Sequence, residues 1–184
     1  MVQEFWKQRD IEVESRRREH EIKVDIVSKM DETINHQLSK ALSIASPLKK
    51  IPTEEEQNTE VENIKNWYFL EAKGIESKLN IYFPETELGR RWDYYARILN
   101  EYIMALFLYL IESDKQKAVK SYSDHIIEYI ISTGNKKYEE DGVIKRLTSN
   151  FNTGSEQASD LMGVFWVEAG NIQRDIMKTR INIF

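Results

Sequence analysis

The hydrophobic pattern predicts that the chain begins with one long helix. No glycine or proline occurs over residues 3–46, and Pro47 follows as a stop. From Val27 onward, apolar positions recur at spacings of three and four residues, which places them on one helix face. This predicted buried stripe consists of Val27, Met30, Ile34, Leu38, Ala41 and Ala45.

The stripe is missing from the N-terminal half of this helix. Ile11 and Val13 are the only apolar residues between positions 7 and 21. Because a helix that is polar on every side has no face to bury, we expect residues 1–22 to form a charged helical stalk that projects from the rest. Residues 23–184 are expected to form the packed helical domain.

Two further amphipathic helices follow. The first covers residues 53–82, with a Thr53–Glu56 capping box at its start. Its stripe is Val61, Ile64, Tyr68, Ala72, Ile75 and Leu79. The next helix is apolar on several faces beyond Tyr102, so we expect it to be central. Its stripe is Trp92, Tyr95, Leu99, Tyr102, Leu106 and Tyr109.

The C-terminal third predicts two more helices with an ambiguous segment between them. Residues 136–152 are compatible with a short helix interrupted near Gly142 or with a loop. The helix before this segment has the stripe Val119, Tyr122, Ile126 and Tyr129. A Thr153–Glu156 cap is expected to begin the last helix. The apolar positions of this last helix are Met162, Phe165, Ala169, Ile172 and Ile176.

No segment shows the two-residue alternation of a strand. Short loops between successive helices favour antiparallel neighbours. The sequence therefore predicts an all-α protein: an antiparallel four- to five-helix bundle with an aromatic-rich core and a long, projecting N-terminal helix.

Composition supports long helices, with only 7 Gly and 3 Pro in 184 residues. No cysteine is present, which excludes disulfides, a thiol nucleophile and thiolate metal ligands.

The longest apolar run, residues 102–111, is about half of the ~20 residues that a membrane span requires. Met1 is followed by a polar segment without the apolar core of a signal peptide.

The triplet Arg16–Arg18 suggests a polyanion site, but its neighbours argue against one. Residues 1–30 carry seven Lys or Arg and seven Asp or Glu, so the segment has no net charge. Acids precede basic residues by four positions, the favourable order within a helix, in pairs such as Glu12–Arg16, Glu14–Arg18 and Glu19–Lys23. We interpret the triplet as part of a solvated helix with internal salt bridges, and we expect no nucleic-acid partner.

Candidate chemistry is sparse. Helix-spaced pairs that a metal site might use are Glu32–His36 and His125–Glu128, but such pairs are more often surface contacts. No glycine-rich phosphate loop or nucleophile elbow is present. We therefore expect no catalytic residue, no metal ligand and no cofactor, and we favour a protein that is not an enzyme.

The segment 89–97, GRRWDYYAR, mixes arginines with aromatic residues, as single-stranded nucleic-acid binders do. Trp92 and Tyr95 belong to the predicted core stripe, however. Arg90, Arg91 and Arg97 are then expected to flank the core and to cover it with their aliphatic stems.

Two segments resemble a family of uncharacterised prokaryotic proteins. The first is EFWKQRDIEVESRRREHEIKVDIVSKM (4–30) and the second is EAKGIESKLNIYFPETELGRRWDYYARIL (71–99). The resemblance implies an N-terminal transmembrane helix, then a basic segment with a tryptophan, a charged helical stalk and a helical domain. It implies no activity and no functional residue. This chain departs from the family pattern because the transmembrane helix is missing.

Three functions remain open at this stage. The first is a non-enzymatic interaction or signal-reception domain with a protein partner or self-association. An anchor upstream of Met1 would hold it near a membrane, and the basic residues after Trp6 would place the domain on the cytoplasmic side. The second is an enzyme or a ligand- or metal-binding bundle with an interior pocket of Tyr and His. The third is a soluble scaffold in the cytoplasm without a membrane link.

Overall fold

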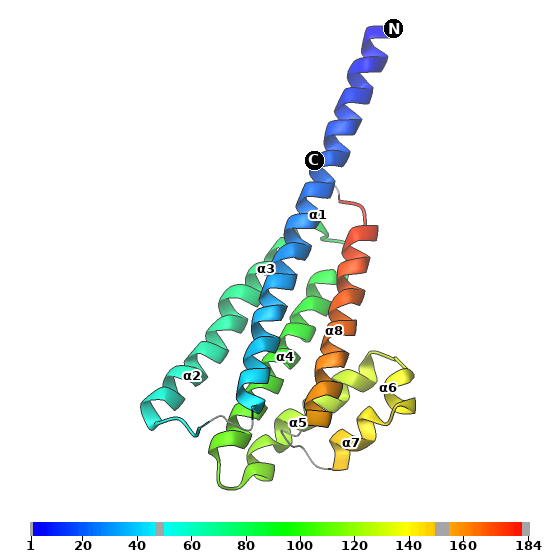
Figure 1. The fold of residues 1–184 in the computed structure, drawn as a ribbon. Coiled ribbons are helices and arrows are strands. Elements are labelled where there is room, and N and C mark those ends of the chain that lie inside the picture. Colours follow the sequence, from blue (N-terminus) through cyan, green and yellow to red (C-terminus); the bar gives the residue numbers. More distant parts are fainter. Residues whose placement is uncertain (1, 47–49, 150–154, 182–184) are drawn as a thin grey trace.

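The chain is helical almost throughout the residues that the computed structural model describes, which are 2–46, 50–149 and 155–181. No strand occurs in those ranges. The first helix, α1 (Val2–Ala45), leads into a group of shorter helices, and its N-terminal end extends well beyond them (Figure 1). The predictions of an all-α fold and of a long N-terminal helix are confirmed.

The buried face of α1 differs slightly from the predicted stripe. Ile26 and Ile44 are buried at its two ends, whereas Val27 and Ala45 are only half-buried, so the prediction was wrong at these positions. The buried face of α1 also includes polar residues, and a pattern of apolar positions alone does not detect them. These buried polar residues include Thr33 and Gln37.

The helix predicted over residues 53–82 is continuous but contains one wide turn. It consists of α2 (Glu54–Asn66), the π-helical turn η1 (Trp67–Ala72) and α3 (Lys73–Tyr82). The capping box is confirmed: Thr53 accepts from the Glu56 amide, and the Glu56 carboxylate accepts from the Thr53 amide. The sequence did not predict the π turn.

The π turn explains why the predicted stripe fails in the middle of this helix. Trp67 is buried in place of the expected Tyr68, which is half-buried. The next buried position after Trp67 is Ala72, five residues later, and this is the spacing of a π-helix. The indole Nε1 of Trp92 donates a hydrogen bond of 2.8 Å to the Ala72 carbonyl and ties the turn to the next helix.

That helix, α4 (Leu88–Ile111), supplies much of the core and packs against α1, α3, α5 and α8. Its predicted stripe is buried except at Tyr109, which is half-buried. Aromatic rings meet here as expected: Tyr95 and Tyr102 lie 5.9 and 5.4 Å from the ring of Phe165. Such contacts add to the free energy of folding that burial supplies.

The segment after α5 (Lys115–Ser132) is ordered as two short helices. These are α6 (Lys137–Glu140) and α7 (Val143–Ser149). Gly142 separates them with a φ of 70°, in the left-handed region that favours glycine. Of the two alternatives for this segment, the interrupted helix is therefore correct as far as residue 149.

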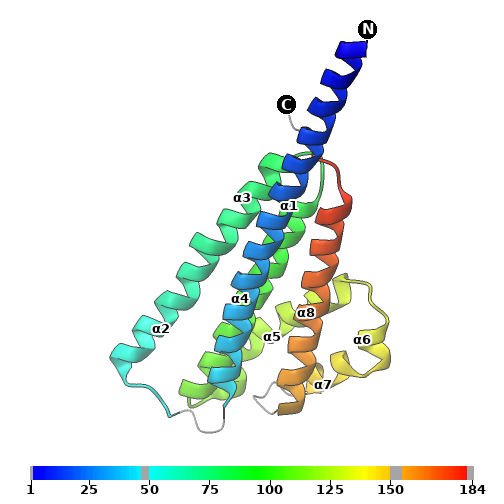
Figure 2. The same cartoon turned by 45° about the horizontal axis from the view of Figure 1, so that its top comes forward.

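The last helix, α8 (Ser155–Lys178), buries Phe165 as predicted, and Met162 is half-buried. The expected cap at Thr153 lies outside the described residues. Figures 1 and 2 show α1, α3, α4 and α8 side by side, with α5, α6 and α7 gathered at the end away from the tip of α1.

Candidate interaction surface

Four exposed apolar side chains of α1 form one line along the helix. Trp6, Val13, Val24 and Leu42 are between 46% and 61% exposed. Successive members are 7, 11 and 18 residues apart, which is about two, three and five turns at ~3.6 residues per turn. We call these four residues the apolar line. Ile11, which is also exposed, lies on the other side of the helix.

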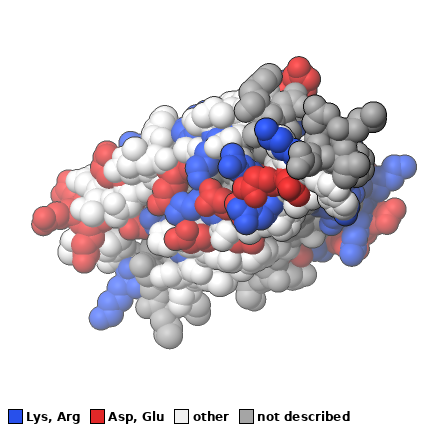
Figure 3. Space-filling model, turned by 90° about the horizontal axis from the view of Figure 1, so that it is seen from above, with Lys and Arg blue, Asp and Glu red and all other residues white. Residues whose placement is uncertain are grey.

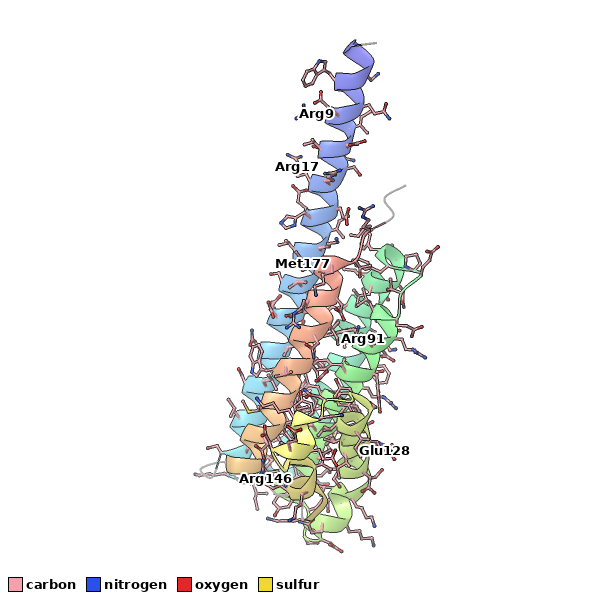
Figure 4. All side chains as sticks on the ribbon, turned by 90° about the vertical axis from the view of Figure 1, so that its right-hand side faces the viewer. Arg9, Arg17, Arg91, Glu128, Arg146 and Met177 are labelled. Atoms are coloured by element: carbon pink, nitrogen blue, oxygen red, sulfur yellow. The ribbon has the colours of Figure 1, made fainter. Side chains whose placement is uncertain are left out.

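The line extends over both halves of α1. Its N-terminal members lie in the projecting segment, which we define as residues 2–18. Figure 4 shows Arg9 and Arg17 on this segment, clear of the other helices, and Met177 of α8 where the two helices meet. The guanidinium of Arg9 lies 5.4 Å from the ring centre of Trp6.

Charges on the projecting segment are largely neutralised within the helix. Glu14 pairs with Arg17 at 3.1 Å and with Arg18 at 3.2 Å, so the predicted Glu14–Arg18 pair is confirmed. No ion pair joins Glu12 and Arg16 among the described side chains, so that predicted pair was wrong. Seen from above, basic and acidic side chains are interspersed (Figure 3). The arrangement does not provide an electropositive patch.

Among the described residues, α1 is joined to the C-terminal end of the chain at Glu19 and Lys23. Lys23 is only 7% exposed, and its Nζ lies 2.6 Å from the Glu19 carboxylate and 3.5 Å from the Met177 carbonyl. Glu19 also accepts a hydrogen bond of 3.1 Å from the amide of Ile181. The hydrogen bond from Lys23 lowers the pKa of the Glu19 carboxyl below its usual range. This cluster attaches α1 to the C-terminal end of α8.

The outer face of α8 continues the surface beside the apolar line. Further along α1, Asp31 accepts a hydrogen bond of 2.7 Å from Gln173. The exposed positions of α8 include apolar side chains and a glycine with open space where a Cβ would be. They are Gly163, Trp166, Val167 and Met177.

An interior tyrosine cluster is the main alternative site. Burial raises the pKa of Tyr95 well above its usual value, and its hydroxyl has no hydrogen-bond partner among the described residues, as is also true of Tyr102. Tyr138 donates a hydrogen bond of 2.8 Å to Glu168 nearby. The pKa of Tyr138 rises because of burial and the adjacent carboxylate, so the hydroxyl remains protonated at neutral pH.

The histidines do not join this cluster. His125 pairs with Glu101 at 2.8 Å rather than with Glu128, and Glu32 pairs with Lys29 rather than with His36. Among the described residues, no group of three possible metal-ligating side chains is found.

The arginine-rich segment of α4 borders a shallow hollow of ≈ 520 Å³. Trp92 is buried as predicted, whereas Arg90 pairs with Glu87, directly before α4, and Arg91 pairs with Asp175 of α8. Arg97 lies 5.1 Å from the ring centre of Tyr94. The arginines therefore flank the core, but two of them are already neutralised.

Beside the hollow, Asp93 joins α4 to the π turn. It accepts hydrogen bonds of 2.7 Å from the Tyr68 hydroxyl and from Lys73. Burial alone would raise the pKa of Asp93, but these hydrogen bonds outweigh it and lower the pKa below its usual value. Lys73 also contacts Glu76 at 2.7 Å. These contacts hold the two helices together and leave little unpaired charge for a ligand.

Comparison with known proteins gives no match to a protein-family model, to a curated protein or to a solved structure. The family resemblance of the two segments quoted above therefore remains untested. None of the helices in the described part of the chain is long and apolar enough to cross a membrane.

Proposed function

We propose that the chain is a non-enzymatic helical interaction module whose binding element is α1. The observation that carries this proposal is the apolar line. Single exposed apolar residues are ordinary, but four of them aligned along a 44-residue helix form a surface that a partner helix can cover. Two members of that line, Trp6 and Val13, lie on the projecting segment, where their side chains are exposed.

The domain that presents α1 is proposed to be a bundle of antiparallel neighbours. The chain direction in Figure 1 supports this, since α1 and α4 run away from the projecting tip while α3 and α8 run back toward it. Such a domain provides a rigid base, which would fix the direction of α1 relative to a partner.

The test uses a photo-crosslinking amino acid placed in the chain within its native cells. Val13 lies on the line, and Ile11 serves as a matched control because both side chains are 61% exposed on the same segment. We expect specific crosslinked products from position 13 and few from position 11. Equal or absent crosslinking from the two positions would contradict the proposal.

A tether near the cytoplasmic face of a membrane, through an anchor upstream of Met1 in the full-length protein, is a second proposal. The exposed Trp6, with Arg9 stacked on it, suits the interface between lipid headgroups and water. The upstream DNA tests it: an open reading frame continuing through about 20 apolar codons would support the anchor. An in-frame stop codon directly upstream would favour a scaffold without a membrane link.

A ligand-binding function is favoured by one observation, the buried hydroxyls of Tyr95 and Tyr102 that lack partners among the described residues. Buried polar groups are normally satisfied, so a bound molecule is one way to complete them. Metal analysis and a thermal-shift screen test this function. Stoichiometric metal, or a stabilising compound whose effect is lost in Tyr95→Phe, would favour it.

A further inference from the structure

We infer that the partner of the apolar line is a second copy of this chain, paired antiparallel along α1 about a two-fold axis at Val24. This inference rests on the proposed function, because it names the partner of the same surface. Three observations lead to it: the length of the line, the spacing of its residues and the charges beside it.

Length selects α1 as its own partner. The line runs from Trp6 to Leu42, which is roughly 54 Å at ~1.5 Å per residue. The next longest continuous stretch of helix in the described residues, α2 with η1 and α3 over residues 54–82, reaches about 44 Å. The helices α4 and α8, with 24 residues each, reach about 36 Å. Within the described part of the chain, α1 alone is long enough to cover the line with one continuous element.

The spacing of the line suits an antiparallel pair. Trp6 and Leu42 each lie 18 residues from Val24, on opposite sides of it. An antiparallel pair centred on Val24 therefore places Trp6 of each copy against Leu42 of the other, and Val24 against its own equivalent. Val13 faces Asn35, which is exposed and 11 residues beyond Val24. The contacts repeat on both halves, as two-fold symmetry requires.

Charge then decides between antiparallel and parallel pairing. Arg17 and Asp31 each lie seven residues from Val24, on opposite sides of it. Antiparallel pairing brings Arg17 of one copy toward Asp31 of the other, twice per dimer. Each would add this contact to the one it has within its own chain, since Arg17 pairs with Glu14 and Asp31 accepts from Gln173. Parallel pairing would set Arg17 against Arg17 and Asp31 against Asp31, which repel one another.

This arrangement gives the projecting segment a binding site. The segment of each copy lies along the domain half of the partner's α1, beside the outer face of α8. The small exposed residue Gly163 and the apolar Trp166 on that face then border the incoming helix. The two N-termini point in opposite directions, so both reach one bilayer only when the paired helices lie along its surface.

Cysteine crosslinking tests the register, because the chain has no cysteine of its own. Under mild oxidation we expect Val24→Cys to form a disulfide dimer. A mixture of Trp6→Cys chains with Leu42→Cys chains should also crosslink, whereas Trp6→Cys and Ile11→Cys alone should not. Efficient crosslinking of Trp6→Cys with itself would indicate parallel helices and would overturn the inference.

Sedimentation equilibrium tests the pairing itself on the full chain. We expect a concentration-dependent dimer whose dissociation constant rises about tenfold or more in Val13→Glu, while Ile11→Glu stays close to wild type. Circular dichroism confirms that each variant is folded. A chain that stays monomeric up to about millimolar concentration overturns the inference. The proposed function would still stand if position 13 then crosslinked to a different protein, and it would fail independently if position 13 captured nothing.

Discussion

At the residue scale, the contact between Glu19 and Lys23 decides where α1 becomes part of the domain. Lys23 is nearly buried, and Glu19 is its carboxylate partner at 2.6 Å. An amine buried without an acceptor costs free energy, whereas exposed pairs such as Arg17–Glu21, at 3.6 Å, contribute little. The sequence predicted the Glu19–Lys23 pair from its spacing but not its burial, which depends on α8.

We predict that Glu19→Gln lowers the free energy of unfolding by about 1–2 kcal/mol at pH 7, because Lys23 loses a charged acceptor. The pKa of Glu19 is lowered in the folded state, so its contribution is present above its ordinary pKa and is lost as the pH falls through the folded-state value. The difference between variant and wild type should therefore vanish in acid. Urea unfolding at several pH values measures this.

The control for that prediction is Glu21→Gln, which removes an exposed carboxylate two residues away. We expect a change within about 0.5 kcal/mol at every pH. Equal effects at positions 19 and 21 would show that the attachment of α1 does not depend on the buried amine.

At the element scale, the π turn is the feature that the sequence concealed. In the sequence, the apolar positions from Val61 to Leu79 keep the spacing of an α-helix. The wide turn becomes evident only in the structure, where Trp67 is buried in place of Tyr68. The turn depends on α4, since the Trp92 indole bonds to the Ala72 carbonyl. Helix positions and caps follow from local patterns, but this distortion requires tertiary contact.

Trp92→Phe should destabilise the protein by about 2–4 kcal/mol. The ring shrinks within a packed core, and the buried Ala72 carbonyl loses its donor. Trp166→Phe is the matched control, because Trp166 is 45% exposed and should tolerate the change at low protein concentration. Thermal unfolding measures both, and equal losses would contradict the importance assigned to the π turn.

Gly142 separates α6 from α7 in a conformation that other residues rarely adopt. Gly142→Ala should cost about 1 kcal/mol because its φ of 70° strains an alanine. Gly74→Ala, in the interior of α3 with open space around it, should stabilise the protein by about 0.5–1 kcal/mol. Denaturant unfolding measures the free energy of unfolding of both variants. If both changes had the same sign, the role assigned to Gly142 between α6 and α7 would be refuted.

At the scale of the whole molecule, the all-α fold and the long first helix follow from the sequence because both depend on local periodicity and on the scarcity of helix breakers. The surface that we propose for interaction was harder to find. Trp6, Val13, Val24 and Leu42 are too far apart to form an obvious sequence pattern. They emerge as a line only when the structure shows which face of α1 the other helices leave exposed.

The central claim is that residues 6–18 of α1 pack against no other helix in the described part of the chain. Amide hydrogen exchange of a monomeric sample, obtained by dilution or with Val24→Glu, tests it most directly. We predict fast exchange over residues 6–18 and strong protection over residues 98–107, which include the buried centre of α4. Strong protection throughout residues 6–18 in a monomer would contradict the account.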